Sequence, residues 1–152
     1  MRNLKTVITG FIAAFCLACI EADGADWRLY AEVAEEDMVI YYDPASITHL
    51  PGNKIRVWIK EIYLDDHGKN EIVSSRIKSG LSARGFENHE FTLERWELDC
   101  AKKKHRLLSV VYYDNNNTVL DTDGSVYSEW FTIGPHSAND RLYEIACLHR
   151  RD

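Results

Sequence analysis

Residues 54–64 read KIRVWIKEIYL, a run in which apolar residues alternate with charged or aromatic ones. The two sides of an extended chain then carry different residues: Ile55, Val57 and Ile59 on one, and Arg56, Trp58, Lys60 and Ile62 on the other. Alternation with a period of two is typical of a β-strand. The turn-forming triplet Pro51-Gly52-Asn53 comes directly before it. This run therefore predicts a long strand.

Five further segments are predicted as strands on either side of this one: 27–33, 38–42, 91–100, 106–114 and 118–120. In the first, one face is expected to hold Trp27, Leu29, Ala31 and Val33, and the other Arg28, Tyr30 and Glu32. A polar turn at 34–37 joins the first two strands into a hairpin. The asparagines 115–117 make the last turn, since Asn tolerates positive φ.

Two segments have helical spacing. After a polar loop at 65–70, Ile72, Val73, Ile77 and Leu81 recur as in a helix, although Gly80 and Gly85 weaken it. The second helix is predicted over 138–148, where Ser137 and Asp140 resemble a capping box. The sum is an α+β domain: an antiparallel sheet of about six strands with a C-terminal helix packed on one face.

The first 24 residues have the order of a signal peptide. A positively charged start at 1–5 is followed by an apolar run at 7–20, which is too short to span a bilayer, and then by small residues. The remaining residues, 25–152, form one domain. Two alternatives stay open for the leader: a buried N-terminal helix, or lipid attachment at Cys19, which follows Leu17 and Ala18.

Outside the leader the sequence contains two cysteines, Cys100 and Cys147. In an oxidising compartment such a pair is most simply a disulfide, and this one would close a loop of about 48 residues. Two free buried thiols are one alternative. Metal ligation is the other, but it would need further ligands, and the sequence offers none at a suitable spacing.

The sequence contains no group of residues typical of catalysis or of cofactor binding. The six histidines are scattered and are expected in loops or on the surface. The segment 121–124 is an acidic turn rather than a calcium loop, since it lacks a late bidentate Glu in register. Glu94 and Glu97 lie on opposite faces of their strand because their separation is odd. We therefore predict neither a catalytic nor a metal site.

Charge limits the classes of partner. The formal net charge is −6, which argues against nucleic acid, whose binding needs a basic footprint. One basic cluster stands out, in the predicted turn 101–105 and at the start of the next strand. It consists of Lys102, Lys103, Lys104 and Arg106, with His105 among them. These four cations are the candidate binding residues, and a solvated turn that protects sheet edges is the alternative.

The sequence resembles the surface-adhesin protein E family in an ordered set of fragments: Trp27, Tyr42-Asp43, Val57-Trp58-Ile59-Lys60, Asp99-Cys100, Tyr112-Tyr113-Asp114, Trp130, Pro135-His136-Ser137 and Glu144-Ile145-Ala146-Cys147. The set spans nearly the whole domain. The resemblance implies a small exported domain with a sheet, a helix and a cysteine pair. The pair carries over onto Cys100 and Cys147. Where such sequences often have Gly after a strand-ending Asp, this one has three asparagines at 115–117, which can make the same turn.

The family's namesake is an adhesin for host extracellular proteins, so the resemblance implies a binding module. We expect a protein of the periplasm or cell surface that recognises a protein or glycan without catalysis and without a cofactor. A membrane would be contacted only through a lipid anchor. The alternative is a small secreted or periplasmic enzyme or inhibitor. A pocket with convergent polar groups would favour the enzyme, and a flat sheet face or exposed aromatic patch would favour binding.

Overall fold

The computed structural model describes residues 25–123 and 129–148. The predicted leader, residues 1–24, lies outside the described residues, as does Gly124 of the predicted acidic turn. The turn prediction is wrong for 121–123, which lie in a strand. The strands are β1 (Arg28–Val33), β2 (Met38–Tyr42), β3 (Thr48–Leu50), β4 (Lys54–Tyr63), β5 (His89–Asp99), β6 (Lys104–Asp114), β7 (Val119–Asp123) and β8 (Phe131–Thr132). The helices are α1 (Asp66–Lys78) and α2 (Ala138–Tyr143), which continues into a wider π-helical segment, Glu144–Leu148. Three short 3-10 helices lie at Ala34–Glu36, Pro44–Ser46 and Phe86–Asn88.

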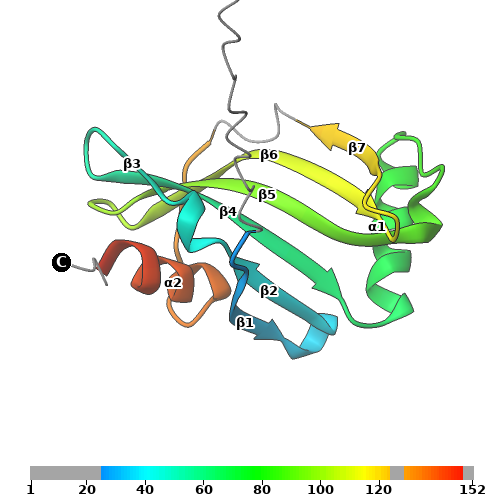
Figure 1. Ribbon diagram of the computed structural model, residues 1–152, viewed down its shortest axis with the longest axis horizontal. Coiled ribbons are helices and arrows are strands. Elements are labelled where there is room, and N and C mark those ends of the chain that lie inside the picture. Colours follow the sequence, from blue (N-terminus) through cyan, green and yellow to red (C-terminus); the bar gives the residue numbers. More distant parts are fainter. Residues whose placement is uncertain (1–24, 124–128, 149–152) are drawn as a thin grey trace, which may run out of the picture.

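All strands belong to one antiparallel sheet in the order β1-β2-β4-β5-β6-β7, with β3 paired to β4 and β8 paired to β6 (Figure 1). The six strands of this path are those that the sequence predicts, and the α+β class is confirmed. The sequence did not predict β3 and β8. They are three and two residues long, too short for an alternating pattern to stand out.

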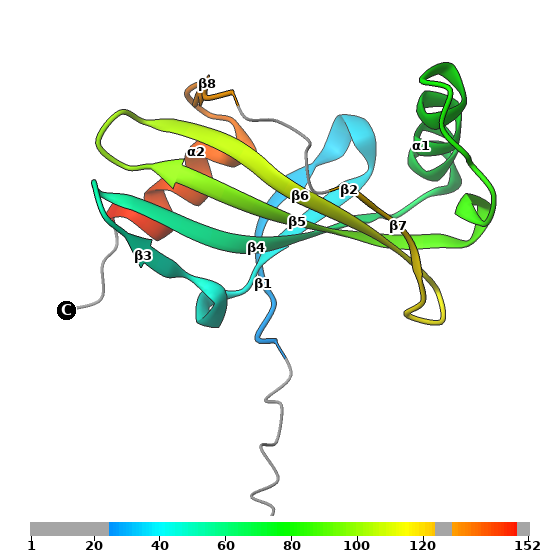
Figure 2. The same ribbon diagram turned by 90° about the horizontal axis from the view of Figure 1, so that it is seen from above.

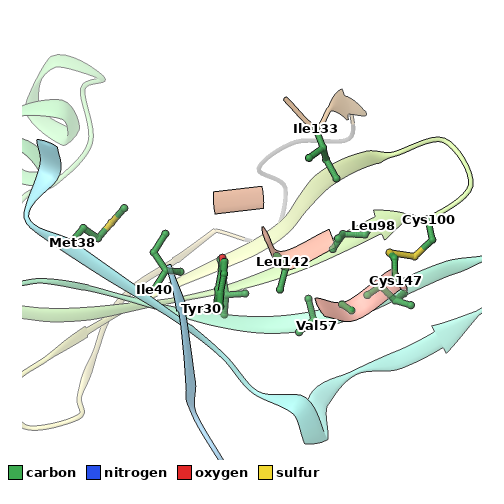
Figure 3. Packing of buried hydrophobic residues seen from close by; sticks show 12 residues of the cluster. Tyr30, Met38, Ile40, Val57, Leu98, Cys100, Ile133, Leu142 and Cys147 are labelled. Atoms are coloured by element: carbon green, nitrogen blue, oxygen red, sulfur yellow. A yellow bond between two sulfur atoms is a disulfide. The ribbon is translucent and has the colours of Figure 1, made fainter. Parts of the chain in front are cut away.

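The sheet has one covered face and one open face. Ile55, Val57 and Ile59 of β4 pack with Leu142 of α2 in the core (Figure 3). Helix α1 lies on the same side, because its Arg76 stacks on rings that share this face. In Figure 2 helix α1 stands above the strands, while α2 overlaps them in this view. Within the described residues, no helix covers the opposite face.

The predicted faces of β1 are wrong at Tyr30. The pairing with β2 slips between Leu29 and Ala31, so Tyr30 is an extra, bulged residue. Its ring turns into the core and is only 9% exposed, whereas Leu29 stays exposed. A bulge reverses the alternation on one side of it, and nothing in a period-two pattern reveals where the bulge lies.

Helix α1 begins earlier than predicted, inside the expected polar loop. Asp65 caps it, accepting from the backbone N–H of Gly68 at 3.0 Å. Its predicted apolar stripe is wrong, since Ile77 and also Leu81 beyond the helix are exposed. The side chain that anchors this helix is instead Arg76, which is buried and pairs with Asp121 of β7.

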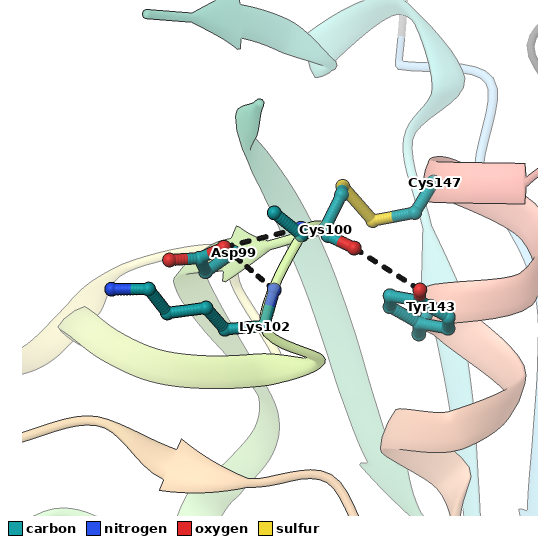
Figure 4. The surroundings of a disulfide bond; sticks show 6 residues. Asp99, Cys100, Lys102, Tyr143 and Cys147 are labelled. Atoms are coloured by element: carbon teal, nitrogen blue, oxygen red, sulfur yellow. Dashed lines mark hydrogen bonds between the residues drawn. A yellow bond between two sulfur atoms is a disulfide. The ribbon is translucent and has the colours of Figure 1, made fainter. Parts of the chain in front are cut away.

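The basic turn between β5 and β6 is shorter than predicted. It is closed by Asp99, whose carboxylate accepts from the backbone N–H groups of Ala101 and Lys102 at 3.1 and 3.0 Å (Figure 4). Strand β6 already begins at Lys104. Lys104 therefore lies on the same strand as Arg106 and not in the turn, because the Asp99 cap lets the hairpin close within a few residues.

The predicted disulfide is confirmed, which excludes both free thiols and metal ligation at these positions. Cys100 and Cys147 are bonded, with their Cα atoms 5.5 Å apart. The Tyr143 hydroxyl also donates to the carbonyl of Cys100 at 3.1 Å (Figure 4). At the other end of α2, the Ser137 side chain accepts from the N–H of Asp140, as the capping pattern predicts. The C-terminal helix is thus tied to the end of β5.

Candidate functional site

The open face is formed by the strand residues that point away from the helices. Pairing places Arg56 beside Glu97, and Glu97 beside Arg106, so one row crosses β4, β5 and β6. The next rows follow at every second residue. We use the name open face for the outward residues of these three strands and for Tyr41 and Trp130 at its margins.

Aromatic rings are spread over the open face. They are Tyr41, Trp58, Phe91, Tyr113 and Trp130, all half-buried. Phe91 and Tyr113 are cross-strand neighbours whose rings stack with centroids 4.7 Å apart and planes 15° apart. Such pairs stiffen a sheet surface. The rings also remain available on their outer sides, because within the described residues no helix lies over them.

Cations alternate with these rings. The open face carries Lys54, Arg56, Lys60, Arg95, Lys104 and Arg106. Four of the contacts are cation–π pairs. Lys60 lies 4.0 Å from the centre of the Phe91 ring, and Arg95 lies 5.7 Å from that of Trp58. Lys54 and Arg106 lie 5.3 and 4.6 Å from the centre of the Trp130 ring. The rings therefore hold the charged groups in place at the surface.

One carboxylate is buried in this row of cations. Glu97 is 2% exposed and accepts from Arg56 and from Arg106, each at 2.8 Å. Burial by itself would raise the pKa of Glu97, but the two guanidinium hydrogen bonds outweigh it and lower the pKa below its usual value. Glu97 is thus ionised and joins three strands at one end of the open face.

The four cations predicted as binding residues are not together. Lys104 and Arg106 belong to the open face, while Lys102 remains exposed in the turn. Lys103 is turned toward α2, where its Nζ lies 2.8 Å from a carboxylate oxygen of Asp140. A binding role of these four residues stays a prediction, and the structure divides them between two surroundings. Cys19, the predicted lipidation residue, lies outside the described residues.

A pair of glutamates, Glu61 and Glu94, lies on the covered face, and the sequence did not predict it. Glu94 and Glu97 do point to opposite faces, as predicted, but Glu94 meets a partner from another strand. Pairing places Glu61 opposite Thr92 and Glu94 opposite Ile59, so the two glutamates are diagonal neighbours on one face. No sequence signal marks the pair, because the two residues are 33 positions apart in the chain.

Burial changes the titration of this pair. It raises the pKa of Glu94 to about 7, against the hydrogen bond that Trp96 donates to Glu94 at 2.7 Å. Burial, followed by the charges of Glu94 and Glu36, raises the pKa of Glu61 well above its usual value. Burial, followed by the charges of Glu61 and Glu94, also raises the pKa of Tyr30. The Tyr30 hydroxyl has no hydrogen-bond partner among the described residues.

We expect the acidic pair to make the protein less stable as the pH rises. Because the folded state raises these pKa values, their stabilising contribution is full below pH 4.5 and is lost as the pH rises through about 7. Residue 94 cannot ionise in Glu94→Gln. The free energy of unfolding of this variant should therefore fall by about 1–2 kcal/mol less than that of the native protein as the pH rises. Urea unfolding at pH 5 and pH 8 measures it, as the difference between the variant and the native protein.

The variant has to be compared with the native protein because His89 changes the pH dependence of stability in the opposite direction. Burial lowers the pKa of His89 to about 4, so its contribution is lost as the pH falls below its usual value of 6.5. Glu87→Gln, at an exposed carboxylate, is the matched control and should leave the pH dependence unchanged. An equal pH dependence in Glu94→Gln and the native protein would contradict the expectation.

The prediction that the histidines lie at the surface is wrong for His89. Its ring is 1% exposed, stacks against Phe86 with planes 6° apart, and lies 2.9 Å from the Thr92 hydroxyl. His105 is half-buried against Trp96, with ring centres 4.7 Å apart. Both histidines lie on the covered face, where neighbouring rings replace water, and this placement follows from strand pairing that a single sequence does not display.

The described residues offer no site of two other kinds. In residues 25–123 and 129–148, no three His, Cys, Asp or Glu side chains are grouped so that they could hold a metal ion. Neither helix in this part of the chain has the length and apolar character needed to cross a membrane.

Comparison with known proteins gives one match. The family model of surface-adhesin protein E matches residues 27–148. Searches of the curated proteins and of the solved structures found no match. The matched segment begins one residue before β1 and ends at the last described residue, so it includes the sheet with its open face and both helices. It covers most of the chain and confirms the resemblance predicted from the sequence: the chain belongs to the surface-adhesin protein E family.

Proposed function

We propose that this protein is an exported surface-binding module that holds a protein or glycan partner on its open face and carries out no catalysis. Family membership supports a surface adhesin role, implies export to the cell surface and suggests a protein that is not an enzyme. The observation that carries the proposal is the open face itself: a row of rings and cations that no helix of the described chain covers.

The composition of the open face is that of a recognition surface. Aromatic residues and Arg are enriched at protein interfaces and dominate their hot spots. Here Arg95 lies over Trp58 and Arg106 over Trp130, so the side chains are ordered before a partner arrives. Ordering in advance reduces the entropy that binding would otherwise cost. The sheet beneath is rigid, being paired through its whole width.

An open cavity among the described residues gives less support to an enzyme. It has a volume of about 710 Å³ and lies between the start of β1, strand β3 and the end of the C-terminal helix. Arg28, Tyr42 and His49 contribute to its lining, but no carboxylate, serine or cysteine does. The lining therefore offers neither a Ser or Cys nucleophile beside a base nor a pair of carboxylates. The cavity therefore does not favour the alternative of a secreted enzyme.

The route to the surface is also part of the proposal. Residues 1–24 act as a cleaved signal peptide, or Cys19 carries a lipid that anchors the domain, residues 25–152. The disulfide supports either route, since such bonds persist in oxidising compartments outside the cytosol. In both cases the folded domain presents the same open face.

A paired set of charge variants tests the binding surface. In Lys60→Ser/Arg95→Ser, two cations of the open face are lost, and retention of a partner should fall at least about tenfold because exposed charges guide and hold the complex. The measurement is retention by the immobilised protein from a panel of purified extracellular-matrix proteins and glycans.

The control removes the same charge from the other side of the molecule. Lys78 and Arg84 are exposed, near the end of α1 and in the segment after it. Lys78→Ser/Arg84→Ser should retain the partner as the native protein does. If both double variants lose the partner equally, or both retain it equally, the result would contradict binding at the open face. A hydrolytic or transferase activity abolished by a single substitution would overturn the non-catalytic assignment.

A further inference from the structure

The open face has a charge opposite to that of the whole protein. The chain has a formal net charge of −6, yet β4, β5 and β6 present six cations on this face. The same rows contain two carboxylates, Glu97 and Asp99, which are 2% and 5% exposed. A buried carboxylate offers little to a ligand at the surface, so the accessible charge of the open face is positive.

The internal pairing does not neutralise these cations. Glu97 is shared by Arg56 and Arg106, so one negative charge faces two positive ones. Asp99 is occupied by two backbone N–H groups of the β5–β6 turn. Lys60 and Arg95 contact aromatic rings, which orient a cation without removing its charge. An anionic ligand therefore meets cations already held in position.

The rings between the cations further restrict which anionic ligands would fit the open face. Trp58 is the cross-strand partner of Arg95, and Lys60 lies over Phe91 of the stacked pair Phe91 and Tyr113. Together these rings add apolar area at the level of the charged groups. The best-matched ligand alternates anionic groups with flat apolar surfaces along its length. Sugar rings, whose C–H faces are apolar, supply such surfaces when they carry sulfate or carboxylate groups.

We propose that the open face binds an anionic polysaccharide, its acidic groups on the cations of β4 to β6 and its sugar rings against Trp58, Phe91 and Tyr113. This proposal rests on the proposed function and names the partner class. Acidic polypeptides match the charge, but their carboxylates stand on flexible stems beside no flat apolar surface. A nucleic acid strand has one charge per 3.4 Å, a density for which a protein of net charge −6 is poorly suited.

The test compares four polymers as probes of the purified protein: chondroitin sulfate, neutral dextran, polyglutamate and single-stranded DNA. Chondroitin sulfate should bind and dextran should not. Affinity for chondroitin sulfate should fall at least about tenfold between 50 and 200 mM salt, as ions displaced by the polymer compete again. Lys60→Ser/Arg95→Ser should weaken binding about tenfold, and Lys78→Ser/Arg84→Ser should not.

Trp58→Leu separates sugar recognition from charge attraction alone. It keeps every cation and removes one ring, so binding of chondroitin sulfate should weaken several-fold while any binding of polyglutamate stays unchanged. The polyglutamate measurement also shows that the variant surface is intact. An unchanged affinity of Trp58→Leu for chondroitin sulfate would overturn the proposal.

The remaining outcomes are also decisive. Polyglutamate bound as tightly as chondroitin sulfate would assign the open face to acidic proteins, and tighter binding of DNA would assign it to nucleic acid. Binding of none of the four polymers would overturn the polysaccharide, while a protein partner lost in Lys60→Ser/Arg95→Ser would leave the proposed function standing. Failure of the inference and failure of the proposed function are thus distinguishable.

Discussion

We expect Cys147→Ser to lower the free energy of unfolding by about 4 kcal/mol, the largest effect of any single substitution considered. The bond joins residues 47 positions apart, and the chain-entropy model assigns about this value to a loop of that length. For a domain of this size the melting temperature should fall by roughly 15 °C. Thermal unfolding followed by circular dichroism, in the absence of reductant, measures the change.

Two controls identify the cause. Reducing the native protein should give the same loss as the substitution, and Cys100→Ser/Cys147→Ser should be no worse than Cys147→Ser. Tyr143→Phe removes only the hydrogen bond to the carbonyl of Cys100 and should cost about 1 kcal/mol. A Cys147→Ser variant that melts at the native temperature would mean that the bond contributes nothing to stability.

The second large effect is expected at Glu97. Glu97→Leu leaves Arg56 and Arg106 side by side without their shared carboxylate, and should cost about 2–3 kcal/mol. We place the value below that of a fully buried pair because the two arginine side chains are 37% and 27% exposed, so water screens part of the repulsion. Urea unfolding at neutral pH measures it.

Replacing the whole row separates charge from packing. In Arg56→Met/Glu97→Leu/Arg106→Met no charge is left unpaired, so stability should recover most of what Glu97→Leu alone loses. Glu97→Gln keeps the acceptor oxygen and should lie between the two. If the triple variant is no more stable than Glu97→Leu, the cost arises from the packing around residue 97 and not from unpaired guanidinium groups.

Much of the fold was predictable because its signals are local. The alternation in 54–64 predicts strand β4, and the Ser137 pattern predicts the start of α2. Cys100 and Cys147 predict their own pairing, since outside the leader the sequence contains no other cysteine. In each case the physical cause acts within a few residues, or leaves only one arrangement to choose.

The errors share another cause. The burial of Tyr30 depends on a bulge in the pairing with β2, and the burial of His89 depends on the rings of Tyr63 and Tyr112 from other strands. Helix α1 was placed from an apolar stripe, but its anchor is Arg76, which pairs with Asp121 across 45 positions of chain. Each outcome depends on a neighbour from a distant segment, which a periodic pattern does not reveal.

The candidate site divides in the same way. The sequence by itself determined that Arg56, Trp58 and Lys60 share one face of a strand, because a period of two is a property of the extended chain. Only the tertiary structure decided that this face is the one without helices and that strands β5 and β6 add Arg95 and Arg106 to it. Strand pairing and helix packing bring distant residues together. The free energy that stabilises these contacts comes from the assembled sheet rather than from any one segment.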